Sequence, residues 1–302
     1  MSGPLKIFCR TCHAKLDVSD LEPFSYFHCP ECDTKIRVPQ RFGRYLLEKV
    51  CGYGGMSKIY RAIDTQLIRK VAIKILDSGN PADIFEEAKL IARAAHPGIV
   101  PVYDCSIFEG RPFLVMRYME NGDLERAMKS GTLPDIPTLA GYLETIAGTL
   151  KALSGKNIVH HDIKPSNILI SRMGTAFLGD FDLADERIAG DLQTPCREWG
   201  SPFYMSPERI YGGGEDHRGD LFSFGATLYE LFSGELPFGM DGDPGVIYER
   251  QQGMHFGALS SLNPAIPDWF SQTVTKLLSF APENRPEITE VIAALKRLQT
   301  LR

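Results

Sequence analysis

Two pairs of cysteines near the start of the chain have the residue type and spacing that suit a bound metal ion. Each pair encloses two residues, and sixteen residues separate Cys12 from Cys29. This is the spacing of zinc sites in which each short turn supplies two thiolates to a tetrahedron. Four of the seven cysteines cluster here, which argues against the spread-out disulfides of a secreted protein. We therefore predict a zinc ion bound by Cys9, Cys12, Cys29 and Cys32, with two disulfides or unconnected thiols as the alternatives.

The sequence around these cysteines repeats at an offset of 20 residues. Cys9, Cys12, Lys15, Leu16 and Val18 recur as Cys29, Cys32, Lys35, Ile36 and Val38. Each half is a cysteine turn followed by a strand-like run, and two such halves resemble a bacterial zinc ribbon. A module this small buries too little surface to fold alone, so the metal should supply its folding free energy. Because four thiolates leave no open coordination position, residues 1–40 are expected to dock an unknown protein partner or to regulate, not to catalyse. Residues 39–43 are expected to be a linker, and His13 and His28 are expected at the surface.

A second stretch with chemical potential runs from His160 to Asn167. It places the carboxylate of Asp162, the ammonium of Lys164 and the carboxamide of Asn167 at short intervals before the apolar residues 168–170. Taken alone, it could be a polar loop before a buried strand. It also resembles the catalytic loop of protein kinases, H-R-D-x-x-x-x-N. The resemblance implies that Asp162 accepts the proton of the substrate hydroxyl or orients it, Lys164 neutralises the transferred phosphoryl group, and Asn167 binds magnesium.

The glycine-rich loop of the same family also has a counterpart here. Residues 52–59 resemble G-x-G-x-x-G-x-V, with Ser57 in place of the third glycine and Ile59 in place of valine. Glycine lets the backbone approach phosphates without a Cβ in the way. The resemblance further implies a hinge near residues 116–119, where Met116 limits the adenine pocket. The implied ATP-binding residues are Gly52, Gly54, Ser57, Ile59, Ala72, Lys74, Met116, Arg117, Tyr118, Met119 and Leu169.

A lysine and a glutamate are expected to form an ion pair of the family. Val-Ala-Ile-Lys at residues 71–74 matches the motif whose lysine binds the α- and β-phosphates of the nucleotide. Apolar residues at helical spacing predict a helix from Asp83 to Ala95. Within it, Glu87 matches the glutamate that pairs with Lys74 in the family, whereas Glu86 is expected to face solvent.

Motifs after the catalytic loop extend the resemblance. The tripeptide that begins at Asp180 matches D-F-G except in its last residue, and Asp180 would be the main magnesium ligand. Residues 200–208 resemble the end of the activation segment. The resemblance implies two structural contacts: Arg285 would pair with Glu208, and a buried helix around residues 220–225 would brace the catalytic loop.

These motifs occur in family order from about residue 45 to residue 297, and the chain is identified as a member of the bacterial, eukaryotic-like Ser/Thr protein kinases. The family implies an α+β, bilobal protein-kinase fold preceded by the ribbon. A small β-rich N-lobe would span about 44–119 and a larger helical C-lobe about 120–302, within a kinase domain of 41–302. The family also implies transfer of the ATP γ-phosphate to a Ser or Thr hydroxyl of a protein substrate, with Mg²⁺ as cofactor.

Three residues depart from the family pattern. His161 stands where the family has an arginine that binds an activation-segment phosphate, and an unperturbed histidine is mostly neutral at pH 7. This weakens the case for activation by phosphorylation, although Thr194 and Ser201 offer hydroxyls for autophosphorylation. Asp182 replaces a glycine and adds a Cβ and a charge near the expected metal, and Ser57 is a milder change. Two alternatives stay open: a pseudokinase that binds nucleotide or partners without efficient phosphoryl transfer, and a chain whose functional centre is the zinc module.

The bulk composition is that of an ordinary globular protein. Hydrophobic residues make up 43% of the chain and charged residues 24%, and the net charge of −5 argues against general nucleic-acid binding. The longest apolar stretch, residues 221–232, contains polar residues and is shorter than the roughly 18–20 residues of a membrane span. The first eight residues have no apolar core of signal-peptide length. We therefore expect a cytoplasmic protein without a membrane span.

Overall fold

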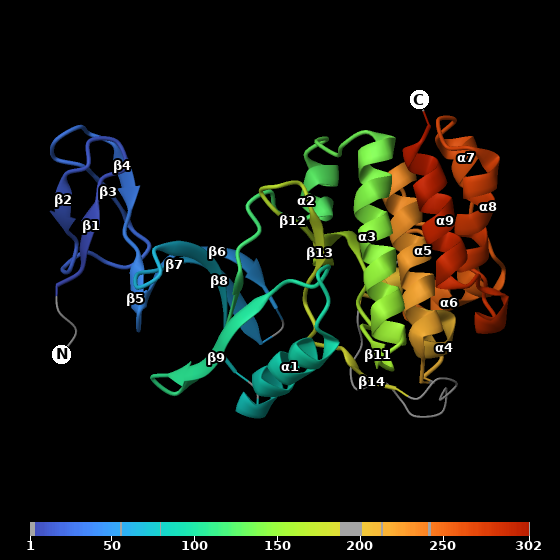
Figure 1. The fold of residues 1–302 in the computed structure, drawn as a ribbon, viewed down its shortest axis with the longest axis horizontal. Coiled ribbons are helices and arrows are strands. Elements are labelled where there is room, and N and C mark those ends of the chain that lie inside the picture. The colour runs from blue at the N-terminus through green and yellow to red at the C-terminus, as the bar shows by residue number, and fades with distance from the viewer. Residues whose placement is uncertain are drawn as a thin grey trace. The chain divides into compact units, whose positions relative to one another are not determined.

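A computed structural model of the chain describes residues 4–54, 56–78, 80–187, 201–212, 214–240 and 243–301 (Figure 1). The chain divides into two compact units. Unit 1 comprises Met1–Ala88 and Pro101–Tyr118, and unit 2 comprises Lys89–Val100 and Met119–Arg302. The largest β-sheet lies in unit 1 and most of the helices lie in unit 2. The expected division into a β-rich N-terminal part and a helical remainder is therefore present.

Two small antiparallel hairpins in unit 1 carry the four clustered cysteines. The first pairs β1 (Lys6–Phe8) with β2 (Lys15–Asp17), and the second pairs β3 (Tyr26–His28) with β4 (Lys35–Arg37). The strands that follow the cysteine turns, β2 and β4, were expected. The strands that precede the turns, β1 and β3, were not predicted, because three residues are too few to show an alternating pattern. The two hairpins share a buried core of Cys9, Leu16, Val18, Cys29 and Val38. The repeat in the sequence is therefore a repeat in structure.

A six-stranded antiparallel sheet forms the rest of unit 1, with strand order β5-β6-β7-β8-β10-β9. Its strands are β5 (Gln40–Phe42), β6 (Tyr45–Tyr53), β7 (Ser57–Asp64), β8 (Arg69–Leu76), β9 (Val102–Phe108) and β10 (Arg111–Arg117). Alternate residues bury one face of the sheet, as in Val71, Ile73 and Ile75 of β8. The predicted helix at 83–95 is α1 (Pro81–Ala94), which begins in unit 1 and ends in unit 2.

The prediction that residues 39–43 form a linker is wrong. Residues 40–42 are β5, which is paired with β6, and the Phe42 side chain is fully buried in the core of the sheet. The ring of Phe42 packs edge-on against Phe113, with 5.2 Å between ring centroids. A second aromatic contact joins the cysteine hairpins to the sheet. The ring of Phe24, which precedes β3, stacks on the ring of Tyr60 in β7, with 6.0 Å between ring centroids. The cysteine hairpins therefore continue directly into the sheet.

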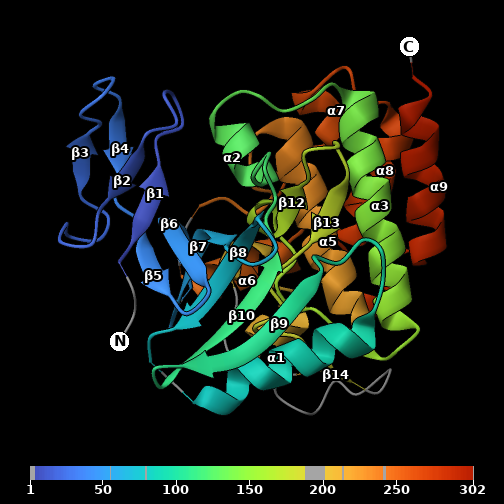
Figure 2. The same ribbon diagram turned by 60° about the vertical axis from the view of Figure 1, so that its left-hand side comes forward.

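Helices dominate unit 2. They are α2 (Leu124–Lys129), α3 (Ile136–Ser154), α4 (Pro207–Ile210), α5 (His217–Ser233), α6 (Pro244–Gln252), α7 (Leu259–Leu262), α8 (Asp268–Leu277) and α9 (Ile288–Gln299). Figures 1 and 2 show α3 beside α9 and α5 beside α8. The start of α3 is set locally, because the Asp135 side chain accepts a hydrogen bond from the Thr138 N–H and Pro137 follows the cap. Helix α5 is buried over most of its length, so charged groups on it are held in the interior.

Short strands and turns in unit 2 position the catalytic-loop stretch. Strand β11 (Ile158–Val159) pairs with β14 (Asp185–Glu186), and β12 (Ile168–Ile170) pairs with β13 (Ala176–Leu178). The 3₁₀ turns are η1 (Pro165–Asn167), η2 (Pro202–Tyr204) and η3 (Pro282–Asn284). Residues 160–167 thus run from the end of β11 to the start of β12, and a strand pair fixes each end. Within the described part of the chain, no helix combines the length and the apolar character needed to cross a bilayer.

Candidate active site

The four clustered cysteines of unit 1 bring their sulfurs together. The Sγ atoms of Cys9 and Cys32 are 3.6 Å apart, as are those of Cys12 and Cys29, and all four lie within 4.8 Å of one another. Zinc bonds to sulfur of about 2.3 Å place the corners of a tetrahedron about 3.8 Å apart, whereas a disulfide needs about 2.0 Å. The donor set and its spacing therefore fit a four-thiolate zinc site better than two disulfides.

The two cysteine turns have matching backbones. His13 and Asp33, 20 residues apart, both adopt left-handed φ values, 61° and 57°. Each also donates its N–H to the carbonyl oxygen of the first cysteine of its turn, His13 to Cys9 and Asp33 to Cys29. The side chains of His13 and His28 are exposed, as expected from the sequence. The repeated turn therefore aims two pairs of sulfurs at one point.

Lys74 and Glu87 form the expected ion pair within unit 1. The Nζ atom of Lys74 lies 3.0 Å and 3.2 Å from the two carboxylate oxygens of Glu87. Both side chains are only 5% exposed, so each charge requires a partner in the interior. The neighbouring Glu86 is exposed, as expected. The role of the pair in binding nucleotide phosphates stays a prediction.

The glycine-rich stretch lies where β6 meets β7. The Gly54 N–H donates to the Ser57 carbonyl at 2.8 Å, and a Cβ on Gly54 would lie 2.7 Å from the Ser57 hydroxyl oxygen. Ser57 is 5% exposed, so it fills space inside the turn. Gly52 pairs with Ile59 across the two strands. A serine at the third position of the motif is therefore accommodated by a glycine at the second.

The remaining residues proposed for nucleotide binding are divided between the two units. In unit 1, Ala72 of β8 is paired with Met116 of β10, and Arg117 ends that strand, with Tyr118 directly after it. In unit 2, Met119 is buried. Leu169, also in unit 2, pairs with Phe177 between β12 and β13. Each of these residues lies on or beside a strand, and their contacts with adenine stay predictions.

In unit 2, the three polar residues of the catalytic-loop stretch converge. The Asn167 side-chain amide donates to the Asp162 carbonyl at 2.8 Å and to its carboxylate at 3.0 Å. Lys164 Nζ lies 2.7 Å from the Asp162 carboxylate and donates to the Ser201 hydroxyl at 2.8 Å. A carboxylate, an ammonium and a serine hydroxyl thus meet, which is a set able to hold a hydroxyl and a negatively charged group together.

The backbone of this loop is held from behind by α5. The Asp220 carboxylate accepts the N–H of His160 at 2.8 Å and the N–H of His161 at 2.9 Å. Burial raises the pKa of Asp220 to about 6, so this side chain is still ionised at pH 7. The predicted bracing of the loop by a buried helix is therefore confirmed.

His160 connects the loop to the residues before Asp180. Burial lowers the pKa of His160 to about 4, so the ring is neutral. Its Nε2–H donates to the Gly179 carbonyl at 3.1 Å, and its Nδ1 accepts the Asp162 N–H at 3.3 Å. The ring also packs edge-on against Phe181, with 4.6 Å between centroids. The position of Asp162 thus depends on the residues around Asp180.

The family model described as "Protein kinase domain" matches residues 45–295, which is most of the chain. The chain belongs to the protein kinase family. Its match covers both the sheet that carries Lys74 and the loop that carries Asp162.

Named relatives of this kinase come from several bacteria. The chain is 35% identical over 264 residues to the "DNA damage-responsive serine/threonine-protein kinase RqkA" of Deinococcus radiodurans, a match that covers 84% of this chain and 39% of the relative. It is 33% identical over 249 residues to the "Serine/threonine-protein kinase PknL" of Mycobacterium tuberculosis, covering 80% of this chain and 62% of the relative. The kinase thus spans between about two fifths and three fifths of the length of these relatives.

The departure at Asp182 can be judged from the backbone of this segment. Asp180 adopts a left-handed φ of 62°, whereas Asp182 does not lie in the left-handed region. An aspartate at position 182 therefore needs none of the conformational freedom that a glycine would provide. Ser201 lies beside Lys164, as described, and Thr194 lies outside the described residues.

The expected structural pair between Arg285 and Glu208 is confirmed. The Arg285 guanidinium donates two parallel hydrogen bonds of 2.7 Å to the two Glu208 oxygens. Arg285 also donates to the carbonyl of Arg218 in α5 at 2.7 Å. The pair thereby joins the end of the activation segment to the helix that braces the catalytic loop.

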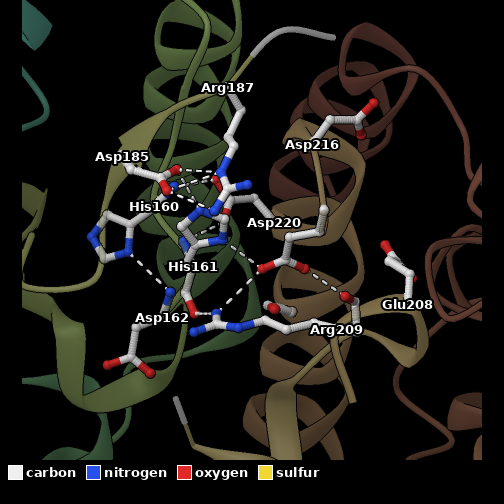
Figure 3. Close-up of polar contacts among 12 residues, drawn as sticks. His160, His161, Asp162, Asp185, Arg187, Glu208, Arg209, Asp216 and Asp220 are labelled. Carbon is white, nitrogen blue, oxygen red and sulfur yellow. Dashed lines mark hydrogen bonds and ion pairs between the residues drawn. The ribbon is translucent and has the colours of Figure 1, made fainter. Parts of the chain in front are cut away.

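His161 is not an unperturbed histidine in this structure. Burial opposes its charge, but hydrogen bonds to Asp185 and Glu215 outweigh burial and raise its pKa to about 9. The ring Nδ1 lies 2.6 Å from Glu215 and the ring Nε2 lies 2.8 Å from Asp185, and Figure 3 labels His161 and Asp185. Neither carboxylate stands out in the sequence, because isolated acidic residues in loops are common and no spacing rule links them to His161. Position 161 of the kinase therefore holds a buried cation.

Proposed function

We propose that the chain is a Ser/Thr protein kinase that transfers the γ-phosphate of ATP to a hydroxyl of a protein substrate. The observation that carries this proposal is the convergence of Asp162, Lys164, Asn167 and Ser201 in unit 2. Family membership and the Ser/Thr kinase names of the relatives support it.

Each residue of the loop has a distinct role in the proposed reaction. Asp162 accepts the proton of the substrate hydroxyl or orients that hydroxyl for attack. The Lys164 side chain lies beside it and neutralises charge on the phosphoryl group during transfer. Because Asn167 uses its amide nitrogen to hold Asp162, its amide oxygen is the atom that would bind a metal ion.

Unit 1 supplies the residues for the proposed nucleotide contacts. Lys74 would bind the α- and β-phosphates, and Glu87 holds its ammonium in place. Gly52 and Gly54 would let the backbone approach the phosphates. Magnesium, held by Asn167 and Asp180, would neutralise phosphate charge when bound.

The transfer assay that tests this proposal uses ³²P-labelled ATP, magnesium and a generic basic protein. Wild type should label the protein, and Asp162→Asn, which keeps the size of the side chain, should lower the rate by about 10²–10⁴-fold. Both proteins should melt at a higher temperature when nucleotide is added. No transfer by wild type, together with a nucleotide-induced rise in melting temperature, would instead establish the pseudokinase alternative.

We also propose that Cys9, Cys12, Cys29 and Cys32 hold a structural zinc ion. The sulfur spacing supports this, because the four donors lie at the separations of a tetrahedral four-thiolate site. None of the six cysteines in the described residues is in a disulfide, as expected for the cytoplasmic compartment that we propose. Elemental analysis of protein purified without chelator should find about one zinc ion per chain, and finding none would refute the site.

The ribbon is proposed to regulate the kinase more than to act as a separately tethered docking module. Its connection to the sheet through β5 and the Phe24–Tyr60 stack support this. An ion pair also joins Arg10 of the first cysteine turn to Glu48 of β6, and Glu48 in turn lies 2.8 Å from Arg61 of β7. Strands β6 and β7 flank the glycine-rich loop, so a structural change in the ribbon should alter the conformation of that loop. The test is the Michaelis constant for ATP before and after zinc removal, which should rise if the ribbon supports the loop.

A further inference from the structure

Every polar atom of His161 has a partner in unit 2 (Figure 3). The backbone N–H donates to Asp220 at 2.9 Å, and the backbone carbonyl accepts from Arg209 Nη1 at 2.6 Å. In the ring, Nδ1 lies 2.6 Å from Glu215 and Nε2 lies 2.8 Å from Asp185. The residue also holds a left-handed φ of 67°, which is uncommon for a non-glycine residue.

The charges of this cluster balance. Among the described residues that contact one another here, the cations are His161, Arg187 and Arg209, and the anions are Asp185, Glu215 and Asp220. The side chains of His161 and Glu215 are 1% and 2% exposed, so solvent screens little of their charge. A neutral ring would leave the cluster with one excess negative charge in the interior, which is costly. The imidazolium is therefore the form that the surroundings require.

The partners of His161 come from β14, from α4, and from α5 with the loop before it. Asp185 lies in β14, within the first residues of the activation segment, and its other partner is Arg187, at 2.9 Å from each carboxylate oxygen. Glu215 precedes α5 and also accepts from Ser206 at 2.5 Å. His161 itself directly precedes Asp162. One ring thus joins the catalytic loop to both sides of the segment that follows it.

The ring has no capacity left for another anion. An imidazolium carries two N–H donors, and both point at carboxylates, whereas an arginine carries five. Asp185 and Glu215 already supply the negative charge that a phosphate on the activation segment would bring to an arginine at this position. A phosphate added beside the cluster would disturb its charge balance.

We propose that His161 is a positioning residue which, held between Asp185 and Glu215, fixes the catalytic loop for phosphoryl transfer without a phosphate on the activation segment. The proposal rests on the proposed kinase function. In this proposal, Asp185 and Glu215 take the role that a phosphate on the activation segment has in kinases with an arginine at the position of His161. It also makes Asp185 and Glu215 necessary for the turnover rate, although neither is expected to touch substrate.

The first experiment compares two forms of the full chain. One form is treated with a phosphatase until mass spectrometry finds no phosphate, and the other is allowed to autophosphorylate. The phosphate-free form should transfer labelled phosphate to a generic basic protein without a lag, at a rate within about twofold of the other form. A lag, or a rate about tenfold lower that recovers on autophosphorylation within residues 180–208, would overturn the inference alone. If neither form transfers phosphate, the proposed function fails and the inference fails with it.

The second experiment tests the charge balance. His161→Gln removes the cation and should lower kcat by about 10–100-fold while the KM for ATP changes by less than about twofold. Adding Glu215→Gln removes one anion and restores the balance of charge. The kcat of the double variant should therefore be about tenfold higher than that of His161→Gln. A side chain that merely filled space at position 161 would gain nothing from the second substitution. His217→Gln is the matched control, since it makes the same change at a histidine two residues from Glu215 and should leave kcat unchanged.

A third variant covers the case in which His161→Gln does not fold, as judged by circular dichroism. Asp185→Asn changes a side chain that is 22% exposed and removes the same ion pair from its other side. It should lower kcat with little change in the KM for ATP, as His161→Gln does. Wild-type kcat in Asp185→Asn, or in the folded His161→Gln, would overturn the proposal.

Discussion

The cysteine ribbon and the His161 cluster each gather ionisable side chains in a small volume, but they differ in where the opposite charge comes from. In the ribbon, Cys9 and Cys32 lie 23 residues apart, and the cluster consists of four cysteine sulfurs, which as thiolates carry negative charge only. In the cluster, His161 contacts Glu215 over a separation of 54 residues and Asp220 over 59, and the described residues of the cluster include three cations and three anions. The ribbon is a local site whose opposite charge would come from the proposed zinc ion, whereas the described residues of the cluster provide charges of both signs from distant segments.

This difference indicates what each region can respond to. A site that depends on a bound metal ion loses its order when the ion is removed or its thiols are oxidised. A buried, balanced set of ion pairs is insensitive to metal but sensitive to any change of a single charge. The two regions lie in different units of the chain, so each can be broken without the same treatment breaking the other.

The largest expected effect is the loss of zinc. Cys29→Ser, at a fully buried ligand, should abolish zinc binding and amide-exchange protection across residues 5–38, because metal binding in such modules contributes about 10 kcal/mol or more to folding. Protection of α5 should stay as in wild type. Cys105→Ser, at a cysteine outside the ribbon, is the matched control and should keep the zinc. A ribbon that remained protected in Cys29→Ser would show that its order does not depend on the metal.

The next effect is the removal of the buried cation. His161→Gln leaves Asp185 and Glu215 partly uncompensated, so the free energy of unfolding of unit 2 should fall by about 3–5 kcal/mol. Chemical denaturation followed by amide exchange in α5 measures it, and zinc content should not change. The double variant with Glu215→Gln should regain part of the loss. Equal losses in the single and double variants would contradict the charge-balance argument.

The parts of the site that could be predicted from the sequence are those fixed by short, ordered motifs. The pairing of Lys74 with Glu87 and of Arg285 with Glu208 was expected because each residue lies in a recognisable motif at family spacing. The matching cysteine turns were visible because the repeat is local. In these cases the residue type and its position along the chain were sufficient, without knowledge of the packing.

The parts that could not be predicted depend on packing between distant segments. Glu215 becomes a partner of His161 only because α5 brings its preceding loop to the catalytic loop, and nothing near Glu215 in sequence signals this. The linker prediction failed for a related reason. Pro39 and Gly43 suggest a turn, but Phe42 between them is buried in the sheet, and burial of one aromatic side chain decides the structure of a three-residue strand.

The charge of His161 should also appear as a pH dependence of stability. Its pKa is raised from 6.5 to about 9 in the folded chain, so its stabilisation is full below about pH 6.5, declines as the pH rises, and is lost above about pH 9. The pKa shift corresponds to a stabilisation of the folded chain by about 3 kcal/mol at low pH. The stability difference between wild type and His161→Gln should shrink over this range, whereas His217→Gln should track wild type. Parallel curves for wild type and His161→Gln would show that the ring is not charged.

The smallest expected effect concerns the space that the Glu215 carboxylate occupies. A Cβ on Gly219, in the first turn of α5, would lie 1.9 Å from one carboxylate oxygen of Glu215 and 2.5 Å from its carboxyl carbon. The carboxylate cannot easily move aside, because it is buried and held by His161, Ser206 and Arg209. Gly219→Ala should therefore destabilise unit 2 by about 2 kcal/mol and lower kcat, through displacement of Glu215.

Another helical glycine provides the matched control for this substitution. Gly148 lies in α3, where an added Cβ would have no neighbour within 4 Å, so Gly148→Ala should stabilise the chain by about 0.5–1 kcal/mol through helix propensity alone. Equilibrium unfolding of both variants gives opposite signs if Glu215 is fixed above Gly219. If Gly219→Ala were stabilising as well, the carboxylate would be free to leave, and the cluster would lose the rigidity that distinguishes it from a site dependent on a bound ion.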